Sequence, residues 1–233
     1  MTTAPPLRGI SSMATRQVLA ELTAAYAASA AEAGPVQIES VGGVDAAKRV
    51  AAGEVFDVVI LASDAIDKLL AAGHLLPGSK VDWVHSGVAV AVPAGAPLPD
   101  IRTEEAVRQA VLAAPSISLS TGPSGVALAK LFERWGIAEQ IAPRMVQAPP
   151  GVPVGSLVAQ GEVALGFQQL SEMLGVAGIT IVGGLPPEVE IITTFSGSVA
   201  ATSEQTEAMQ ALLAFWTSAA CTPLKLQHGM QTA

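Results

Sequence analysis

Three short loops rich in serine, threonine and glycine carry residue types suited to holding an anion. They read Gly9-Ile-Ser-Ser-Met-Ala-Thr, Ser40-Val-Gly-Gly-Val-Asp and Ser118-Leu-Ser-Thr-Gly-Pro-Ser-Gly. Where such a loop opens a helix, unpaired backbone N–H groups and the positive dipole end attract negative charge, and hydroxyl groups add neutral donors. In any single loop, Ser, Thr and Gly are also ordinary helix-cap and turn residues, so the prediction of an anion site requires all three loops. None of them fits a Walker or a dinucleotide-binding fingerprint.

Acid–base chemistry has its own candidates. We interpret Glu172 and Asp64 as possible bases, with His85 third. Asp64, together with Ser63, is also placed to cap a helix, and Glu172 is also readable as an exposed carboxylate. No nucleophile–base pair stands out, so the sequence gives little support to hydrolysis by a serine mechanism. Arg16, one turn inside a helix, is the charged candidate for pairing with a ligand carboxylate, although its position fits a solvated helix residue somewhat better.

Alternating strand and helix patterns must position these residues. Apolar residues share one face of a predicted helix from Arg16 to Ala33, and the run from Val55 to Ala62 is typical of a parallel strand covered on both faces. Since each loop follows a strand and opens a helix, all three would lie at carboxyl ends of strands, where open α/β sheets bind ligands. Turn-rich breaks divide the chain into two expected lobes, residues 1–85 with 187–233, and residues 86–186.

Two segments carry a resemblance to a known family. Phe56-Asp-Val-Val-Ile-Leu-Ala-Ser-Asp64 and Ala159-Gln-Gly-Glu-Val-Ala-Leu-Gly-Phe167 are similar to segments of the molybdate-binding proteins of bacterial uptake systems and their wider family, which includes aconitate-isomerase-like members. The resemblance covers essentially the whole chain. It implies the type II solute-binding fold, an α/β architecture of two Rossmann-like lobes joined by a two-segment hinge.

The family's molybdate site resembles a cage of two serines, backbone amides and a tyrosine. Ser11 or Ser12 matches the first serine, whereas Gly42 and Gly43 stand in the second serine's loop and Gln169 stands at the tyrosine position. Two hydroxyl donors are thus absent, which favours a carboxylate over a tetrahedral metal oxyanion. The ligand-binding candidates are Ser11, Ser12, Arg16, Gly42, Gly43, Ser63, Thr121, Gly122, Ser124, Gly125, Val152 and Gln169.

Composition limits the partners. The net charge of −8 disfavours nucleic acid as a partner, and no apolar run is long enough to span a membrane. One cysteine and three scattered histidines indicate neither a disulfide nor a metal site, and we expect no cofactor. We expect a monomer. The N-terminus has no secretory pattern, which predicts a cytoplasmic protein, or a periplasmic one if a signal was removed.

Two functions follow as expectations. The first is capture of a small anion, a carboxylate or a tetrahedral oxyanion, in the cleft between the lobes, with an ABC permease as partner if the protein is exported. The alternative is a cytoplasmic, cofactor-independent isomerase that moves an allylic proton in a small di- or tricarboxylate, as in aconitate isomerisation.

Overall fold

The chain folds into two compact units, each with its own sheet and core. The computed structural model describes residues 6–29, 34–149 and 151–233. Unit 1 comprises residues 1–85 and 194–233, and unit 2 comprises residues 86–193. Strands β4 (Val81–Pro93) and β8 (Ile192–Val199) run from one unit into the other. Residues 187–193, which the sequence pattern assigned to the first lobe, belong by their contacts to unit 2.

Unit 1 is built on the expected parallel β-α-β alternation. Its strand order is β2-β1-β3-β8. Strand β1 pairs in parallel with β2 and β3, while β8 pairs antiparallel with β3. The elements are β1 (Leu7–Ser12), η1 (Met13–Thr15), α1 (Arg16–Ser29), β2 (Val36–Val41), α2 (Gly43–Ala51), β3 (Val58–Ala62), α3 (Ser63–Ala71), α9 (Thr206–Thr217), η4 (Ala219–Cys221), α10 (Thr222–Gln227) and β9 (Met230–Thr232).

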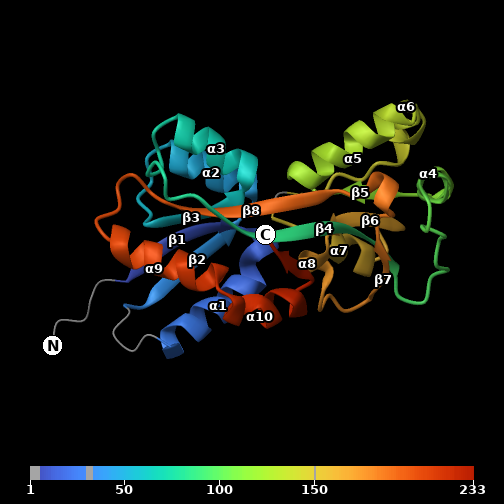
Figure 1. Cartoon of the computed structure of the whole chain (residues 1–233). Coiled ribbons are helices and arrows are strands. Elements are labelled where there is room, and N and C mark those ends of the chain that lie inside the picture. The colour runs from blue at the N-terminus through green and yellow to red at the C-terminus, as the bar shows by residue number, and fades with distance from the viewer. Residues whose placement is uncertain (1–5, 30–33, 150) are drawn as a thin grey trace. The chain divides into compact units, whose positions relative to one another are not determined.

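Strand β3 is buried on both faces, as its apolar run predicts. Val58 and Ile60 pack into the core formed with α1 and α9, whereas Val59 and Leu61 pack into the core formed with α2 and α3. Figure 1 shows α2 and α3 over one face of this sheet and α1, α9 and α10 over the other. The alternation of side chains along the strand thus supplies both cores. Because β1, β2 and β3 run parallel, the helices that follow them begin at the same edge of the sheet.

Unit 2 has a mixed sheet with order β4-β6-β5, and β7 pairs with β4. Strands β5 and β6 run parallel, with Leu119 opposite Phe167, while β6 and β7 are each antiparallel to β4. The elements are α4 (Glu104–Ala113), β5 (Ile117–Leu119), α5 (Pro123–Arg134), α6 (Ala138–Ile141), η2 (Ala142–Arg144), α7 (Val154–Ala159), β6 (Leu165–Gln169), α8 (Leu170–Met173), β7 (Ile179–Gly184) and η3 (Pro187–Val189).

The two faces of the unit 2 sheet have separate cores. Helix α5 packs Leu128 and Phe132 against Phe167 on one face. On the other face, Met173 of α8 packs against Ala89 and Ala91. Figure 1 shows α5 on one side of β6, with α7 and α8 on the other. Because the short strands β5 and β6 are parallel, both release the chain at the same edge of the sheet.

Two predicted helix boundaries can be compared with the structure. Helix α1 begins at Arg16 as expected and is described to Ser29, whereas the predicted end at Ala33 lies outside the described residues. The prediction that Ser63 or Asp64 caps α3 is wrong. The N-cap is Ala62, which has no side-chain cap hydrogen bond, because β3 passes directly into the helix and makes Ser63 its first residue. Among the described residues, no helix combines the length and apolar character needed to cross a bilayer.

Candidate functional site

The carboxyl edge of the unit 1 sheet gathers two of the predicted loops. Ser11, the next-to-last residue of β1, lies opposite Ser40 of β2, and their Oγ atoms share a hydrogen bond of 2.7 Å. Ser11 is fully buried and its hydroxyl also lies 3.3 Å from the carbonyl oxygen of Ser12. The hydroxyl of Ser11 is therefore buried at the edge of the sheet, where it bonds to neighbouring residues and is not exposed to solvent.

Ser12 and Gly43 lie side by side at the same edge. A Cβ on Gly43 would be 3.8 Å from Oγ of Ser12. The Oγ of Ser12 accepts the N–H of Ala14 at 3.3 Å, which caps η1 and leaves the hydroxyl proton free to be donated. The first backbone hydrogen bond of α2 runs from Ala46 N to Gly42 O, so the N–H groups before it point out of the helix end. The structure thus joins Ser12, Gly42 and Gly43 into one candidate anion-binding edge.

Three other candidates of unit 1 lie on the surface or at helix starts. Arg16 is exposed at the first position of α1, and Ser63 is partly buried at the first position of α3. Asp64 is exposed and forms an ion pair with Lys68 at 3.3 Å. An exposed carboxylate paired with a lysine is an ordinary surface arrangement, and it gives Asp64 no enclosed position from which to act on a bound substrate.

The third loop opens α5 in unit 2 and is tightly folded. Gly122 is the N-cap, and the first helical hydrogen bond runs from Val126 N to Gly122 O, so the helix end presents the N–H groups of Ser124 and Gly125. Ser124 is buried, and its Oγ lies 2.9 Å from Oγ of Ser120. Thr121 is exposed at the tip of the loop. This loop has the properties of an anion-binding helix terminus.

A second set of candidate side chains lies at the end of strand β6 and in α8, which follows it. The Nε2 of buried Gln168 donates to Oε1 of Glu172 at 2.9 Å, and Oε1 of Gln168 accepts the N–H of Gly155 at 3.1 Å. Burial raises the pKa of Glu172 to about 7, and the hydrogen bond from Gln168 opposes this rise. Glu172 is therefore not the exposed carboxylate of the alternative interpretation. Its pKa suits a group that takes up and releases protons near neutral pH.

Gln169 and His85 lie where the chain passes between the units. With the Gln169 carboxamide oxygen accepting from the Thr193 hydroxyl (2.7 Å), its NH₂ group donates to Oγ (2.8 Å) and to the carbonyl oxygen (3.0 Å) of Ser86. Gln169 is 3% exposed. His85 Nδ1 lies 3.0 Å from Oγ1 of Thr194. Both side chains thus link β4 to β8, and the amide of Gln169 is occupied by protein groups.

Val152 is the remaining candidate. It is 37% exposed and lies two residues before α7, the helix that supplies the Gly155 N–H to Gln168. The ligand-binding roles of all these residues stay predictions. Sequence reasoning missed Ser40, Ser120 and Gln168 as members of the site, although Ser40 and Ser120 stand in the loops quoted above and Gln168 directly follows the segment that ends at Phe167. Their partners are fixed by strand pairing and helix packing, which residue type alone does not reveal.

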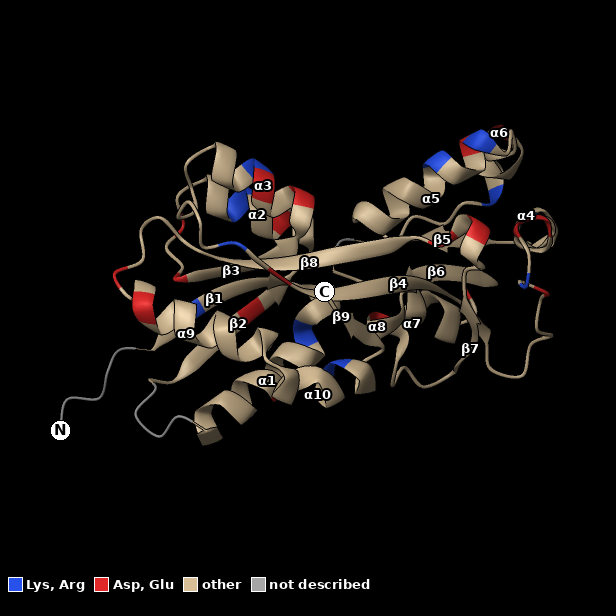
Figure 2. Ribbon diagram, viewed as in Figure 1, with Lys and Arg blue, Asp and Glu red and all other residues tan. Residues whose placement is uncertain are grey.

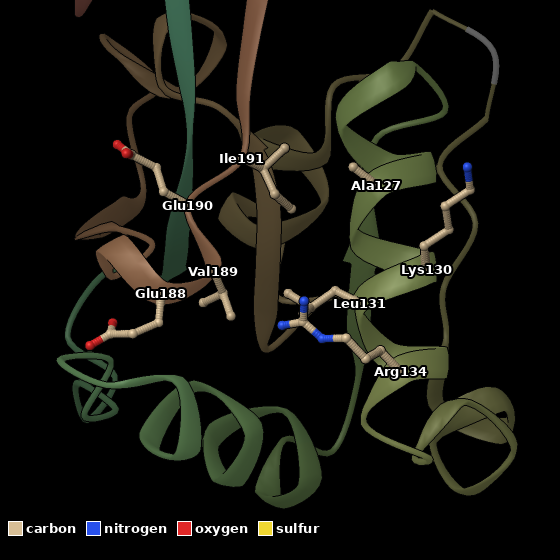
Figure 3. A pocket seen from close by; sticks show the side chains of 8 residues that line it. All are labelled: Ala127, Lys130, Leu131, Arg134, Glu188, Val189, Glu190 and Ile191. Atoms are coloured by element: carbon tan, nitrogen blue, oxygen red, sulfur yellow. The ribbon is translucent and has the colours of Figure 1, made fainter.

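A separate pocket of about 300 Å³ lies between α5 and the segment entering β8. Figure 3 shows Leu131, Val189 and Ile191 around it, with the Arg134 guanidinium reaching across. Arg134 also forms an ion pair with Glu104 at 2.8 Å. None of the predicted site residues lines this pocket. Within the described part of the chain, His, Cys, Asp and Glu residues form no group of three able to hold a metal ion.

Comparison with solved structures identifies the fold. The Azotobacter vinelandii periplasmic molybdate-binding protein superposes with a TM-score of 0.79 at 19% identity, covering 96% of this chain and 98% of that one. The Mycobacterium tuberculosis sulfate-binding protein SubI also gives 0.79, at 18% identity, covering 99% of this chain and 88% of that one. The chain has the type II fold of periplasmic solute-binding proteins.

The sequence places the chain within this class. Residues 7–231 match the family of bacterial extracellular solute-binding proteins, and the chain belongs to that family. An aconitate isomerase from Pseudomonas sp. is 41% identical over 171 residues, which is 73% of this chain. The matched region spans 65% of that relative's length, slightly less than two thirds. Both the solute-binding family and its isomerase-like members were expected from the sequence.

Proposed function

We propose that this protein binds a small di- or tricarboxylate and moves an allylic proton within it, with Glu172 as the base. The observation that carries the proposal is the partly buried Glu172 carboxyl, whose pKa burial raises to about 7. At neutral pH such a carboxyl exists in both protonation states, so it can remove a proton in one half of the reaction and return it in the other. The 41% identical aconitate isomerase supports the substrate class.

The anion-binding loop and the base occupy neighbouring strand ends within unit 2. Strand β5 leads to the helix start at Ser124 and Gly125, strand β6 leads to Glu172, and the two strands pair in parallel with Leu119 opposite Phe167. A substrate carboxylate held by the N-terminal N–H groups of α5 would leave the rest of a short polycarboxylate near the end of β6. This arrangement supports binding and proton transfer on one edge.

The reaction balances without an added reactant. Ionised Glu172 takes a proton from the methylene carbon of the substrate, and the C–H electron pair delocalises through the C=C bond into the adjacent carboxylate. The protonated Glu172 then returns the proton to the far carbon of the allylic system, so the double bond moves by one position. Backbone N–H groups at the helix termini would stabilise the charge that develops on the carboxylate oxygens.

Proton NMR in heavy water tests the proposal. The protein is incubated with cis- and then trans-aconitate, and we expect interconversion together with entry of deuterium into the substrate. Glu172→Gln should lower the rate by about 10²-fold or more. Glu162→Gln, the same change at an exposed residue of unit 2, serves as the control, and Asp64→Asn tests the other candidate base. Binding of both acids with neither exchange nor interconversion would exclude aconitate isomerisation.

Reversible anion binding without catalysis is the second candidate. It is supported by family membership and by the joined loops at Ser12, Gly42 and Gly43. In that role the protein would act outside the cytoplasmic membrane and deliver its ligand to an ABC permease. Thermal shifts with molybdate, tungstate, sulfate and di- or tricarboxylates measure binding directly. At a ligand concentration 100 times Kd, the free energy of unfolding should rise by about 2.7 kcal/mol.

A further inference from the structure

Gln168 is fixed in one orientation by a partner outside its own strand. It is 3% exposed in β6, and its Oε1 accepts the backbone N–H of Gly155 at 3.1 Å. That N–H can only donate, so the oxygen of the carboxamide must face it. The NH₂ group is thereby turned away from α7 and reaches Oε1 of Glu172 at 2.9 Å. The direction of the amide is set by geometry and leaves a donor facing the carboxyl.

The segment that holds this amide is itself closely packed. Gly166, two residues before Gln168, faces α7 so tightly that a Cβ there would lie 2.6 Å from Val158 and 2.9 Å from Val154. Gly155 is buried, and a Cβ on it would meet Val176 at 3.6 Å. Helix α7 therefore has little room to shift against β6, and the hydrogen bond from Gly155 to Gln168 is held by this packing.

We propose that Gln168 is a positioning residue that connects the first turn of α7 to the Glu172 carboxyl and holds this carboxyl in its proton-transfer orientation. This inference rests on the proposed role of Glu172 as the base. We call the two hydrogen bonds that connect the Gly155 N–H, the Gln168 carboxamide and the Glu172 carboxyl the relay. Because the donor is neutral, it stabilises the ionised carboxylate without adding a second titrating group.

Burial raises the pKa of Glu172, and the hydrogen bond from the neutral Gln168 amide is the interaction that opposes this rise. Strand β6, helix α7 and strand β7 contain no ionisable side chain, and on α8 Glu172 is the one such group. Figure 2 shows β6 and α7 without charged residues. Strand β4 pairs with β6 and carries Asp82 and His85, and α5 contacts β6 and carries Lys130, Glu133 and Arg134. None of these groups contributes to the pKa of Glu172. Removing the Gln168 donor should therefore raise that pKa further above about 7.

Substitution of Gln168→Met tests the relay, because methionine keeps the length and bulk of glutamine and removes both polar atoms. The pKa of Glu172 is measured by carbon NMR titration of the ligand-free protein, so the measurement is independent of turnover. We expect an upward move of about one to two pH units, the equivalent of one hydrogen bond to a charged group. The acidic limb of the kcat/KM profile should move by the same amount.

Gln160→Met makes the same change at the exposed C-cap residue of α7, and it should leave the pKa of Glu172 unchanged. The amide resonance of Gly155 should move in Gln168→Met and stay in place in Gln160→Met. If Gln168→Met lowers stability while the pKa of Glu172 stays near 7, Gln168 is a packing residue only and the inference is overturned. If the wild-type protein fails to isomerise aconitate, the proposed function fails, while the titration still decides whether the relay exists.

Discussion

The carbonyl oxygen of Ser120 occupies the space that a side chain on residue 125 would need. An added Cβ on Gly125 would overlap this oxygen, and it would also approach Oγ of Ser120 to 3.3 Å. Gly125 therefore allows the loop to fold back on the first turn of α5. The same fold brings the hydroxyls of Ser120 and Ser124 together at 2.9 Å.

Gly125→Ala should therefore open the loop. We expect a loss of about 1–3 kcal/mol in the free energy of unfolding, as for other overpacked sites, together with weaker anion binding. Denaturant unfolding and calorimetry measure the two effects. Gly122→Ala adds the same methyl group three residues earlier, at the N-cap, where nothing lies within 4 Å, and should cost only the roughly 0.5–1 kcal/mol of a poorer cap. Equal losses in both variants would contradict this account.

The pH dependence of stability should contain a contribution from Glu172. Its pKa is about 7 in the folded protein and 4.5 in the reference state, so the folded state binds more protons between these values. The cost of burying the charge is absent below pH 4.5 and complete above about 7. Glu172→Gln should therefore stabilise the protein at pH 8 by up to about 3 kcal/mol and leave stability near pH 4.5 unchanged.

Chemical denaturation of the wild type and Glu172→Gln at several pH values checks this prediction. Glu162→Gln is the control, since its carboxyl is exposed. A stabilisation of the same size at pH 4.5 and pH 8 would show that ionisation of Glu172 is not its cause.

Lys225 is a second buried ionisable group. It is 1% exposed on α10, and its Nζ donates to the carbonyl oxygen of Trp83 at 2.9 Å. Burial lowers the pKa of Lys225, so the folded state binds fewer protons than the unfolded state as the pH approaches 10.5. The penalty for burying the charge is complete below the folded pKa and declines as the pH rises above it.

Lys225→Met should therefore stabilise the protein most at neutral and acidic pH, and the gain should shrink toward pH 10. Thermal denaturation across this range measures the difference. Lys48→Met, at an exposed position of α2, should show no such trend. A gain that is independent of pH would assign the effect to packing.

Ligand preference is a fourth testable property. The resemblance to the molybdate-binding proteins predicts that Gly43 and Gln169 stand at two positions that hold hydroxyl donors in that family. The amide of Gln169 is held by Thr193 and Ser86, which leaves it without a free donor comparable to a hydroxyl. We expect di- or tricarboxylates to bind more tightly than molybdate in calorimetry. Submicromolar binding of molybdate with no carboxylate binding would reverse this preference.

Much of the architecture follows from local sequence patterns. The apolar run before Ser63 predicted a strand buried on both faces, and β3 packs Val59 and Val58 into different cores. Helix α1 begins at Arg16 as its spacing of apolar residues predicted. Such patterns are readable because the strand and helix periods are properties of neighbouring residues.

The sequence predicted only in part how the Ser12 and Gly43 loops come together. Parallel strands release their loops at one edge, so the proximity of the Ser12 and Gly43 loops could be expected. The hydrogen bond between Ser11 and Ser40 could not, because it depends on the register of two strands 29 residues apart. A shift of the register by one residue would have separated these hydroxyls.

From the sequence alone came the type II fold, implied by the family resemblance, three loops predicted to bind an anion, and a short set of candidate bases. Only the tertiary structure distinguished among those bases. Asp64 lies in solvent with Lys68, while Glu172 is enclosed and receives the amide of Gln168, which α7 holds in place. Residue type gives a carboxyl its ordinary pKa, but burial and fixed dipoles, contributed by segments distant in the chain, decide what that pKa becomes.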